Sequence, residues 1–195
     1  GPKSHPTWVA LNDSIDEEGQ LLIFVGTRKS AESEALKLSK RVSKKLSKTN
    51  PEKLADLESL ASSIEGKRQS AMADKLVECL KGGTAFHHAG LTHGQRKAIE
   101  RAFKDGKISC LTATPTLAAG VNLPARRVLV RDIKRWDDGM SRPLPVMEVR
   151  QMLGRAGRPN YDDYGEAWVL CKGTDGWELA DMVSEKYFFG EVEPI

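Results

Sequence analysis

Two arginines, Arg155 and Arg158, stand three positions apart in the segment QMLGRAGRP, which occupies positions 151–159. On a continuous helix, at about 100° per residue, these side chains and that of Gln151 would project from one face. Two guanidinium groups placed in this way could bind a phosphoryl group in transfer, or two carboxylates. The alternative is a surface helix end whose arginines stabilise the helix dipole.

Gly154 and Gly157 interrupt this segment and favour a ligand-binding role. A glycine inside a helix costs roughly 1 kcal/mol relative to alanine. Such a cost indicates a close approach to another surface, and Pro159 would then end the helix. We therefore predict a site that offers one amide and two guanidinium groups.

A second segment, GTRKS at positions 26–30, follows a predicted strand and begins a helix. The phosphate-binding pattern GxxxxGK[ST] needs glycine where this chain has Ile23 and Arg28. No other stretch fits that pattern, so the chain by itself lacks a cradle for a triphosphate. The helix start and Arg28 could still bind one isolated phosphate, and the alternative is an ordinary strand-to-helix turn.

The adjacent histidines His87 and His88 suggest a metal site at first sight. On a strand, however, neighbouring side chains point to opposite faces and cannot easily share an ion. We predict that one histidine is core-facing and the other is polar-facing. Cys79, Cys110 and Cys171 lack metal-ligand spacing, which predicts reduced thiols, a cytosolic protein and no metal site.

The elements that must position these residues alternate between short apolar runs and amphipathic stripes. The stripes predict helices over 31–46, 51–64, 72–80 and 95–103, and the runs predict strands over 21–25, 84–87, 108–113, 128–130 and 167–171. This alternation predicts an α/β fold with a mostly parallel sheet flanked by helices. Ligands should then gather in the loops that follow strands, at 26–29, 88–91, 114–124 and around Asp132.

Composition sets the broad class. The 195 residues are 39% hydrophobic and 29% charged with a net charge of +3, which predicts one soluble domain over residues 1–195. No apolar run approaches the roughly 18 residues that cross a membrane, and no signal peptide is evident. Between 112–125 and 151–159, residues 126–136 read as a strand, 137–139 as a turn and 141–146 as a returning edge strand with two prolines.

Taken together, four segments resemble motifs of superfamily 2 helicases of the Ski-like branch, in the family's order along the chain. Positions 22–28 resemble motif IV, 87–91 with Arg96 motif IVa, 112–125 motif V and 151–159 motif VI. The likeness is to the archaeal helicases that act at stalled forks. It implies that this chain is the second RecA-like motor domain of a helicase. The first motor domain, absent from this chain, would hold ATP and Mg²⁺.

The resemblance also implies residue roles. Arg155 and Arg158 match arginine fingers, Gln151 matches the residue that couples them to nucleotide, and Gly120 and Asn122 match positions near the nucleotide. Many wider relatives have Asp where Asn122 stands. The positions that match contacts to nucleic acid are Thr27, Arg28, His88, Gly90, Arg96, Thr112 and Thr114.

The stretch between motifs V and VI resembles the strand-separating hairpin of the DNA-unwinding members. Lys134, Arg135 and Trp136, which we place near its tip, could grip phosphate and stack a base. The alternative is an ordinary edge hairpin.

The resemblance implies a function in repair or restart of stalled replication forks. We expect a monomer that binds single-stranded or forked DNA and acts with the first RecA-like domain of its own polypeptide. The isolated domain should be inactive. The location would be cytoplasmic, at the nucleoid, in an archaeon and nuclear in a eukaryote. An RNA helicase domain of the same branch, or a nucleic-acid-binding module without activity, are the alternatives.

Overall fold

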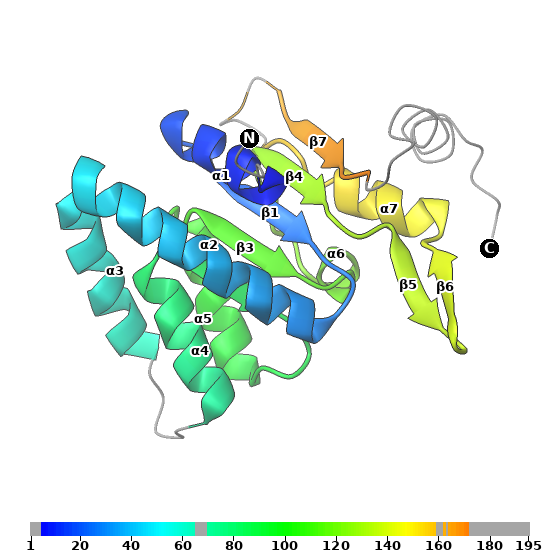
Figure 1. Ribbon diagram of the computed structural model, residues 1–195, viewed down its shortest axis with the longest axis horizontal. Helices are drawn as coiled ribbons and strands as arrows, with labels where there is room; N and C mark the ends of the chain where they lie inside the picture. Colours follow the sequence, from blue (N-terminus) through cyan, green and yellow to red (C-terminus); the bar gives the residue numbers. More distant parts are fainter. Residues whose placement is uncertain (1–4, 65–69, 159–161, 163, 172–195) are drawn as a thin grey trace.

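The computed structural model describes residues 5–64, 70–158, 162 and 164–171, and its centre is a five-stranded parallel sheet (Figure 1). The strand order is β2-β3-β1-β4-β7, and each neighbouring pair runs parallel. The strands are β1 Leu21–Phe24, β2 Thr84–His87, β3 Cys110–Ala113, β4 Arg127–Val130 and β7 Glu166–Val169. This arrangement confirms the predicted α/β class and the mostly parallel sheet.

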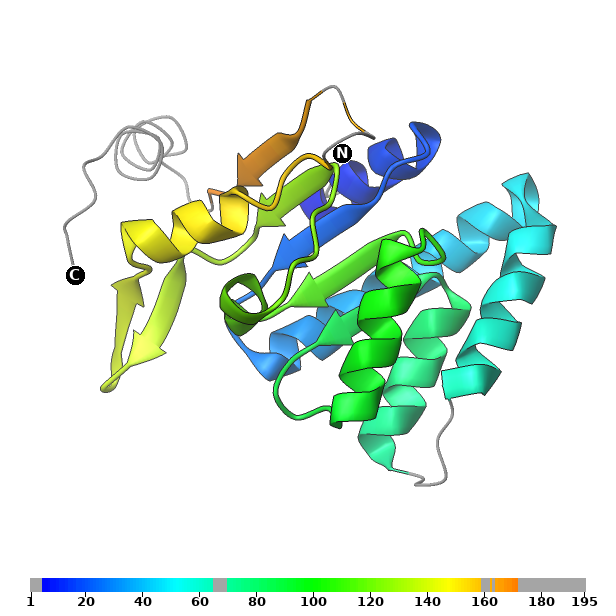
Figure 2. The same ribbon diagram turned by 180° about the vertical axis from the view of Figure 1, so that it is seen from behind.

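Helices cover both faces of the sheet, as the front and back views show together (Figures 1 and 2). Helices α1, α2 and α4 lie on one face, α5, α6 and α7 lie on the other, and α3 packs against α2 and α4. Their bounds are α1 Pro6–Asp16, α2 Arg28–Thr49, α3 Pro51–Ile64, α4 Ala71–Lys81, α5 His93–Lys104, α6 Thr116–Gly120 and α7 Val146–Leu153. In the described part of the chain, no helix is both long and apolar enough to cross a bilayer.

The core forms where the apolar patterns predict it. All residues of β1 to β4 are buried, as expected for strands covered on both faces. The apolar face of α2, from Ala31 to Leu46, is buried against the sheet, whereas α3 buries only Leu57 and Ala61 of its apolar face. Thr92 begins α5 with a complete capping box that uses Gln95. The predicted helices therefore exist, and they differ in how much of each stripe is covered.

Helix α1 was not predicted, and the structure shows what stabilises it. Pro6 stands at its first turn, and the guanidinium of Arg127 on β4 binds Asp13 at 2.7 Å and Glu17 at 2.9 Å. The same guanidinium lies 5.3 Å from the centre of the Trp168 ring on β7. The helix therefore depends on partners more than one hundred positions away, which a local pattern does not reveal.

The predicted long strand over 126–136 is wrong. Strand β4 ends at Val130, and a separate antiparallel hairpin joins β5 Lys134–Asp137 to β6 Met140–Pro143. Its turn has only two residues, Asp138 with φ 48° and Gly139 with φ 74°, which is the type I′ geometry of tight hairpins. After β4, Asp132 accepts a hydrogen bond from the Gly26 N–H at 2.8 Å, which ties the end of β4 to the turn after β1.

Candidate functional site

A groove of about 660 Å³ lies at the carboxyl edge of the sheet, between the loops that follow β1 and β3 and the start of α7. We call it the carboxyl-edge groove. It brings together predicted site residues that are far apart in the sequence and were given different roles, and these are Thr27, Arg28, Thr114, Arg135 and Gln151. The structure thus places motifs IV, V and VI around one hollow.

One wall of the groove is the turn that begins α2. The Thr27 hydroxyl accepts a hydrogen bond from the Ser30 N–H at 3.0 Å and so caps the helix, while Arg28 is exposed. Behind them, the bond from Gly26 to Asp132 fixes the turn, and Asp132 also binds Arg131 at 2.9 Å. Helix starts attract anions because N–H groups and the dipole point outward, so this wall can bind one phosphate.

The motif IVa loop is held from the inside. The Nδ1 of His88 accepts a hydrogen bond from the Gly90 N–H at 3.0 Å, and its ring stacks on Phe86 at 5.5 Å. A Cβ on Gly90 would lie 2.8 Å from the His88 ring, so this glycine is required by packing. Arg96 donates to the Leu91 carbonyl at 3.1 Å and closes the loop. These residues shape the loop, and any contact of His88 with a ligand would use its backbone.

His87 and His88 point to opposite faces, as predicted. His87 lies 3.3 Å from Glu100 on α5, and His88 lies 3.7 Å from Glu32 on α2. Both histidines are buried and each faces a glutamate, so both are polar-facing, where the prediction expected only one to be. Among the described residues, no cluster of histidine, cysteine or carboxylate side chains could hold a metal.

The buried histidines predict how stability depends on pH. Burial lowers the pKa of both, although their glutamate neighbours raise it in part. Below the usual histidine pKa of about 6.5 the unfolded chain therefore binds protons that the folded chain does not. The free energy of unfolding should fall as the pH drops from 7.5 to 5.5, by up to roughly 1.4 kcal/mol per pH unit for each histidine.

Urea unfolding across this pH range measures the effect. A double variant, His87→Gln with His88→Gln, should lose most of the slope even where it is less stable at every pH. An unchanged slope in the double variant would assign the pH dependence to other groups.

Thr112 is a correction to the predicted interface. Its side chain is fully buried in β3, and its hydroxyl donates to the Ala31 carbonyl of α2 at 2.7 Å. The hydroxyl thus joins the sheet to a covering helix and cannot meet a ligand in this conformation. Thr114, two residues later, stands at the rim of the groove with its hydroxyl 3.1 Å from that of Thr116.

Motif VI does not form one continuous helix. Helix α7 ends at Leu153, and Gly157 takes φ 90°, a left-handed conformation that favours glycine. The turn is tied to the start of β4, because Gly157 donates to the Ala125 carbonyl at 2.7 Å. A Cβ on Gly165 would lie 2.3 Å from the Gly157 nitrogen. Gly157 therefore does mark a close approach, but to another segment of this domain, whereas a Cβ on Gly154 would meet only the backbone of α7.

The shared face predicted for Gln151, Arg155 and Arg158 is therefore wrong. Gln151 lies on α7 at the carboxyl-edge groove, whereas Arg158 lines a hollow at the opposite edge, beside Gln20 and Ser109. Arg158 binds the Asp162 carboxylate through Nε and Nη2, each at 2.9 Å, which keeps the Asp162 pKa below its usual value. Pro159, predicted to end the helix, lies outside the described residues.

The remaining predicted positions lie apart from the groove. Gly120 and Asn122 are exposed, and Asn122 lines a hollow of about 650 Å³ against Lys97 and Arg101 of α5. A Cβ added to Gly120 would meet nothing within 4 Å, so packing among the described residues does not demand glycine there.

The hairpin is anchored at its base. Arg135 binds Glu148 on α7 at 3.2 Å, and Lys134 pairs with Pro143 at the end away from the turn. The predicted place of these two residues near the tip is therefore wrong. The Trp136 backbone lies nearer the turn, opposite Ser141, and its side chain is outside the described set.

Comparison with known proteins identifies the family. Residues 62–160 match the helicase conserved C-terminal domain. The chain is 43% identical over its full length to an "ATP-dependent DNA helicase Hel308" of Methanocella arvoryzae. Proteins of the same name from Pyrococcus horikoshii and Thermoplasma volcanium are 44% and 40% identical over 94% and 95% of the chain. The chain spans about a quarter of the length of these relatives.

The matched segment contains Ala89 of the motif IVa loop, the start of α6 and helix α7, which line part of the carboxyl-edge groove, and it also contains the motif VI turn at the opposite edge. The full-length identity extends the likeness to α1, β1 and α2. This chain belongs to the helicase conserved C-terminal domain family, within superfamily 2.

Proposed function

We propose that this chain is the second motor domain of an ATP-dependent DNA helicase, one that acts in repair or restart of stalled replication forks. The observation that carries the proposal is the carboxyl-edge groove, in which Arg28 and the α2 start meet Thr114 and Gln151. The names of the relatives support DNA as the substrate. The fork role rests on the motif resemblance, as does a place at the nucleoid.

The groove would hold one strand by its phosphates. Backbone N–H groups at the α2 start and the exposed Arg28 side chain offer hydrogen bonds and positive charge, and Thr114 adds a hydroxyl at the rim. Contacts of this kind position a strand and carry no sequence information. A motor that moves along DNA of any sequence needs such contacts, so the residue types fit the proposed task.

ATP and Mg²⁺ would be bound mainly by the first motor domain, because no segment of this chain follows the phosphate-loop pattern. Arg155 and Arg158 would then stabilise negative charge on the phosphoryl group in transfer. Gly120 and Asn122 would lie near the same nucleotide, on the exposed turn after β3. The hairpin β5–β6, exposed along β6, would separate the strands ahead of the motor.

Binding of single-stranded DNA by the 195-residue chain tests the groove. Arg28→Gln should weaken binding and reduce the slope of log affinity against log salt by roughly 0.7, the value for one lost phosphate contact on a single strand. Arg101→Gln removes an equal charge from an exposed position on α5, outside the groove. Equal losses in both variants would show non-specific attraction and sink the groove assignment.

An ATPase assay of the same preparation adds a second check. We expect no hydrolysis above background with or without DNA, because the triphosphate cradle is not in this chain. Measurable ATP hydrolysis by this chain alone would contradict the proposal that the first motor domain binds the triphosphate.

A further inference from the structure

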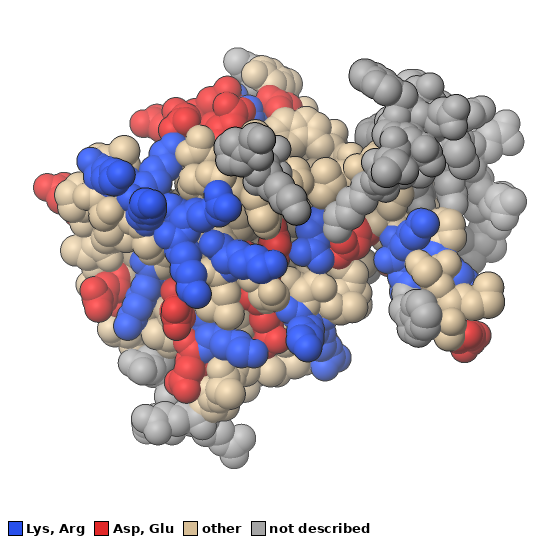
Figure 3. Space-filling view, viewed as in Figure 1, with Lys and Arg blue, Asp and Glu red and all other residues tan. Residues whose placement is uncertain are grey.

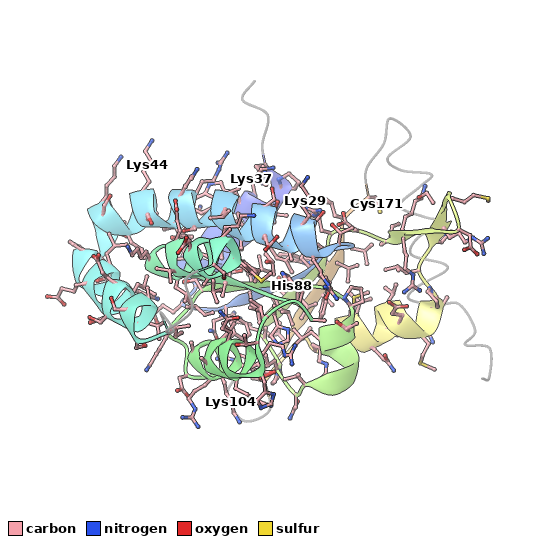
Figure 4. All side chains as sticks on the ribbon, turned by 90° about the horizontal axis from the view of Figure 1, so that it is seen from below. Lys29, Lys37, Lys44, His88, Lys104 and Cys171 are labelled. Atoms are coloured by element: carbon pink, nitrogen blue, oxygen red, sulfur yellow. The ribbon has the colours of Figure 1, made fainter. Side chains whose placement is uncertain are left out.

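The outward face of α2 carries a row of cations. Figure 3 shows lysine and arginine side chains gathered over this helix, and Figure 4 shows Lys29, Lys37 and Lys44 pointing away from the sheet. We call the exposed members of this row the α2 stripe, and they are Lys29, Lys37, Lys40, Arg41, Lys44 and Lys48. From first to last the stripe extends about 29 Å, at 1.5 Å per residue.

The charge of the α2 stripe is not balanced on its own helix. The two acids of α2 face inward, because Glu32 contacts His88 and Glu34 is buried against Arg131. Among the described residues, no carboxylate forms an ion pair with Lys37, Lys40, Lys44 or Lys48. A merely solvated helix usually alternates charges of both signs along its face. A row of one sign indicates a ligand of the opposite sign.

A membrane and a protein fit the stripe poorly. Membrane-surface helices insert an apolar face, but that face of α2, from Ala31 to Leu46, is buried in the core. Protein interfaces are depleted in lysine at their centres and rely on aromatic, methionine and arginine anchors. Between its cations the α2 stripe presents Ser33 and Ser47, and the one aromatic ring that contacts it among the described residues, Trp8 of α1, lies 5.8 Å from the Arg41 guanidinium. Lysine and serine are instead the side chains that contact nucleic-acid phosphates.

Two further observations select duplex over single-stranded DNA. Proteins that bind single strands stack bases on a series of aromatic rings. Helix α2 contains none, and the Trp8 ring of α1 beside it already stacks against Arg41. The stripe is also straight, and about 29 Å corresponds to roughly eight base pairs at 3.4 Å each. The start of helix α2, at Thr27 and Arg28, forms a wall of the carboxyl-edge groove. The stripe therefore begins where the proposed single-strand site ends.

We infer that the α2 stripe binds the phosphate backbone of duplex DNA, as a second contact separate from the carboxyl-edge groove. The inference rests on the proposed function in one respect, that the groove binds a strand of DNA. A molecule with a single-stranded and a duplex part would then occupy both sites at once. The second contact becomes intramolecular, which raises the affinity for tailed DNA above that of either part.

The test uses the 195-residue chain and three probes, a 20-nucleotide oligo(dT), a blunt 20-base-pair duplex and the same duplex with an oligo(dT) tail. In the triple variant Lys37→Gln, Lys40→Gln, Lys44→Gln, the salt slope for the duplex should shrink by roughly 2.7, at 0.9 per lost contact. The loss of duplex affinity between 50 and 200 mM salt then becomes smaller by a factor of about 40. Oligo(dT) binding should stay unchanged.

A matched variant, Arg101→Gln, Lys104→Gln, Lys107→Gln, removes the same charge from exposed positions on α5 and just after it, and Figure 4 shows Lys104 on the opposite side of the sheet from Lys37. It should keep the wild-type slope. If wild-type chain fails to bind oligo(dT), the proposed function fails. If it binds oligo(dT) but the two triple variants give the same duplex slope, the stripe inference is overturned. A fourth probe, poly-glutamate, tests for an acidic protein partner. If the variant Lys37→Gln, Lys40→Gln, Lys44→Gln loses poly-glutamate binding but keeps duplex binding, the inference is also overturned, in favour of such a partner.

Discussion

Arg158→Ala, in a polypeptide that also carries the first motor domain, should lower ATP turnover by roughly 10³- to 10⁵-fold. This is the range measured when a guanidinium that stabilises a transferring phosphoryl group is removed. DNA binding should be nearly unchanged, because Arg158 lies at the edge of the sheet opposite the carboxyl-edge groove. Steady-state ATPase rates at saturating DNA, alongside DNA titrations without nucleotide, measure the two quantities.

The ion pair between Arg158 and Asp162 makes a rival explanation possible, and a second variant separates the two. If Arg158 acts only by fixing its turn through Asp162, then Asp162→Asn should reduce turnover as much as Arg158→Ala does. If the guanidinium itself reaches the phosphoryl group, Asp162→Asn removes only the carboxylate that aligns Arg158. It should then lower ATP turnover far less than Arg158→Ala does. Arg158→Lys keeps the charge but not the planar fork, and should recover little of the rate.

Equal turnover in Arg158→Ala and wild type would remove this residue from the finger role. Equal losses in Arg158→Ala and Asp162→Asn would assign it a positioning role within the domain. Thermal unfolding of each variant, followed by circular dichroism, checks that the substitution in the turn beside β4 has not unfolded the chain.

The sequence predicted best the elements that are stabilised by burial of a regular apolar pattern. Strand β1 and helix α2 carry continuous apolar patterns, and any covering layer would bury them in the same way. Helix α1 could not be predicted in this way, because its attachment depends on Arg127, which is far along the chain. Pattern therefore reveals an element best when burial alone stabilises it.

The site was predicted in part for a similar reason. Loops after strands met at the carboxyl edge, because parallel strands all end there, and this brought Thr27, Arg28 and Thr114 together. The split between Gln151 and Arg158 was not predictable, since it follows from a turn in which Gly157 touches Gly165. Thr112 and His88 occupy motif positions, yet their side chains pack inward. A motif names a position along the chain and does not say which way its side chain points.

Gly82→Ala should be the most destabilising of the single methyl additions that we predict, because Gly82 is where α4 ends against α2. A Cβ there would lie 2.1 Å from the Ser39 hydroxyl oxygen and 2.4 Å from the Ser39 carbonyl oxygen. The hydroxyl can rotate away, but the carbonyl belongs to the α2 backbone, so the two helices must separate. Overpacking of this kind costs about 3 kcal/mol, which corresponds to a melting temperature lower by roughly 6–12 °C in a domain of this size.

Gly94→Ala provides the matched control, since it adds the same methyl group in the first turn of α5. A Cβ there would meet nothing within 4 Å. Alanine also has the higher helix propensity, so this variant should be more stable by about 0.5–1 kcal/mol. Thermal or urea unfolding of both variants should therefore show shifts of opposite sign. If Gly82→Ala unfolds at the wild-type temperature, α4 can move away from α2 without loss, and the packing of these helices is looser than the contact between Gly82 and Ser39 requires.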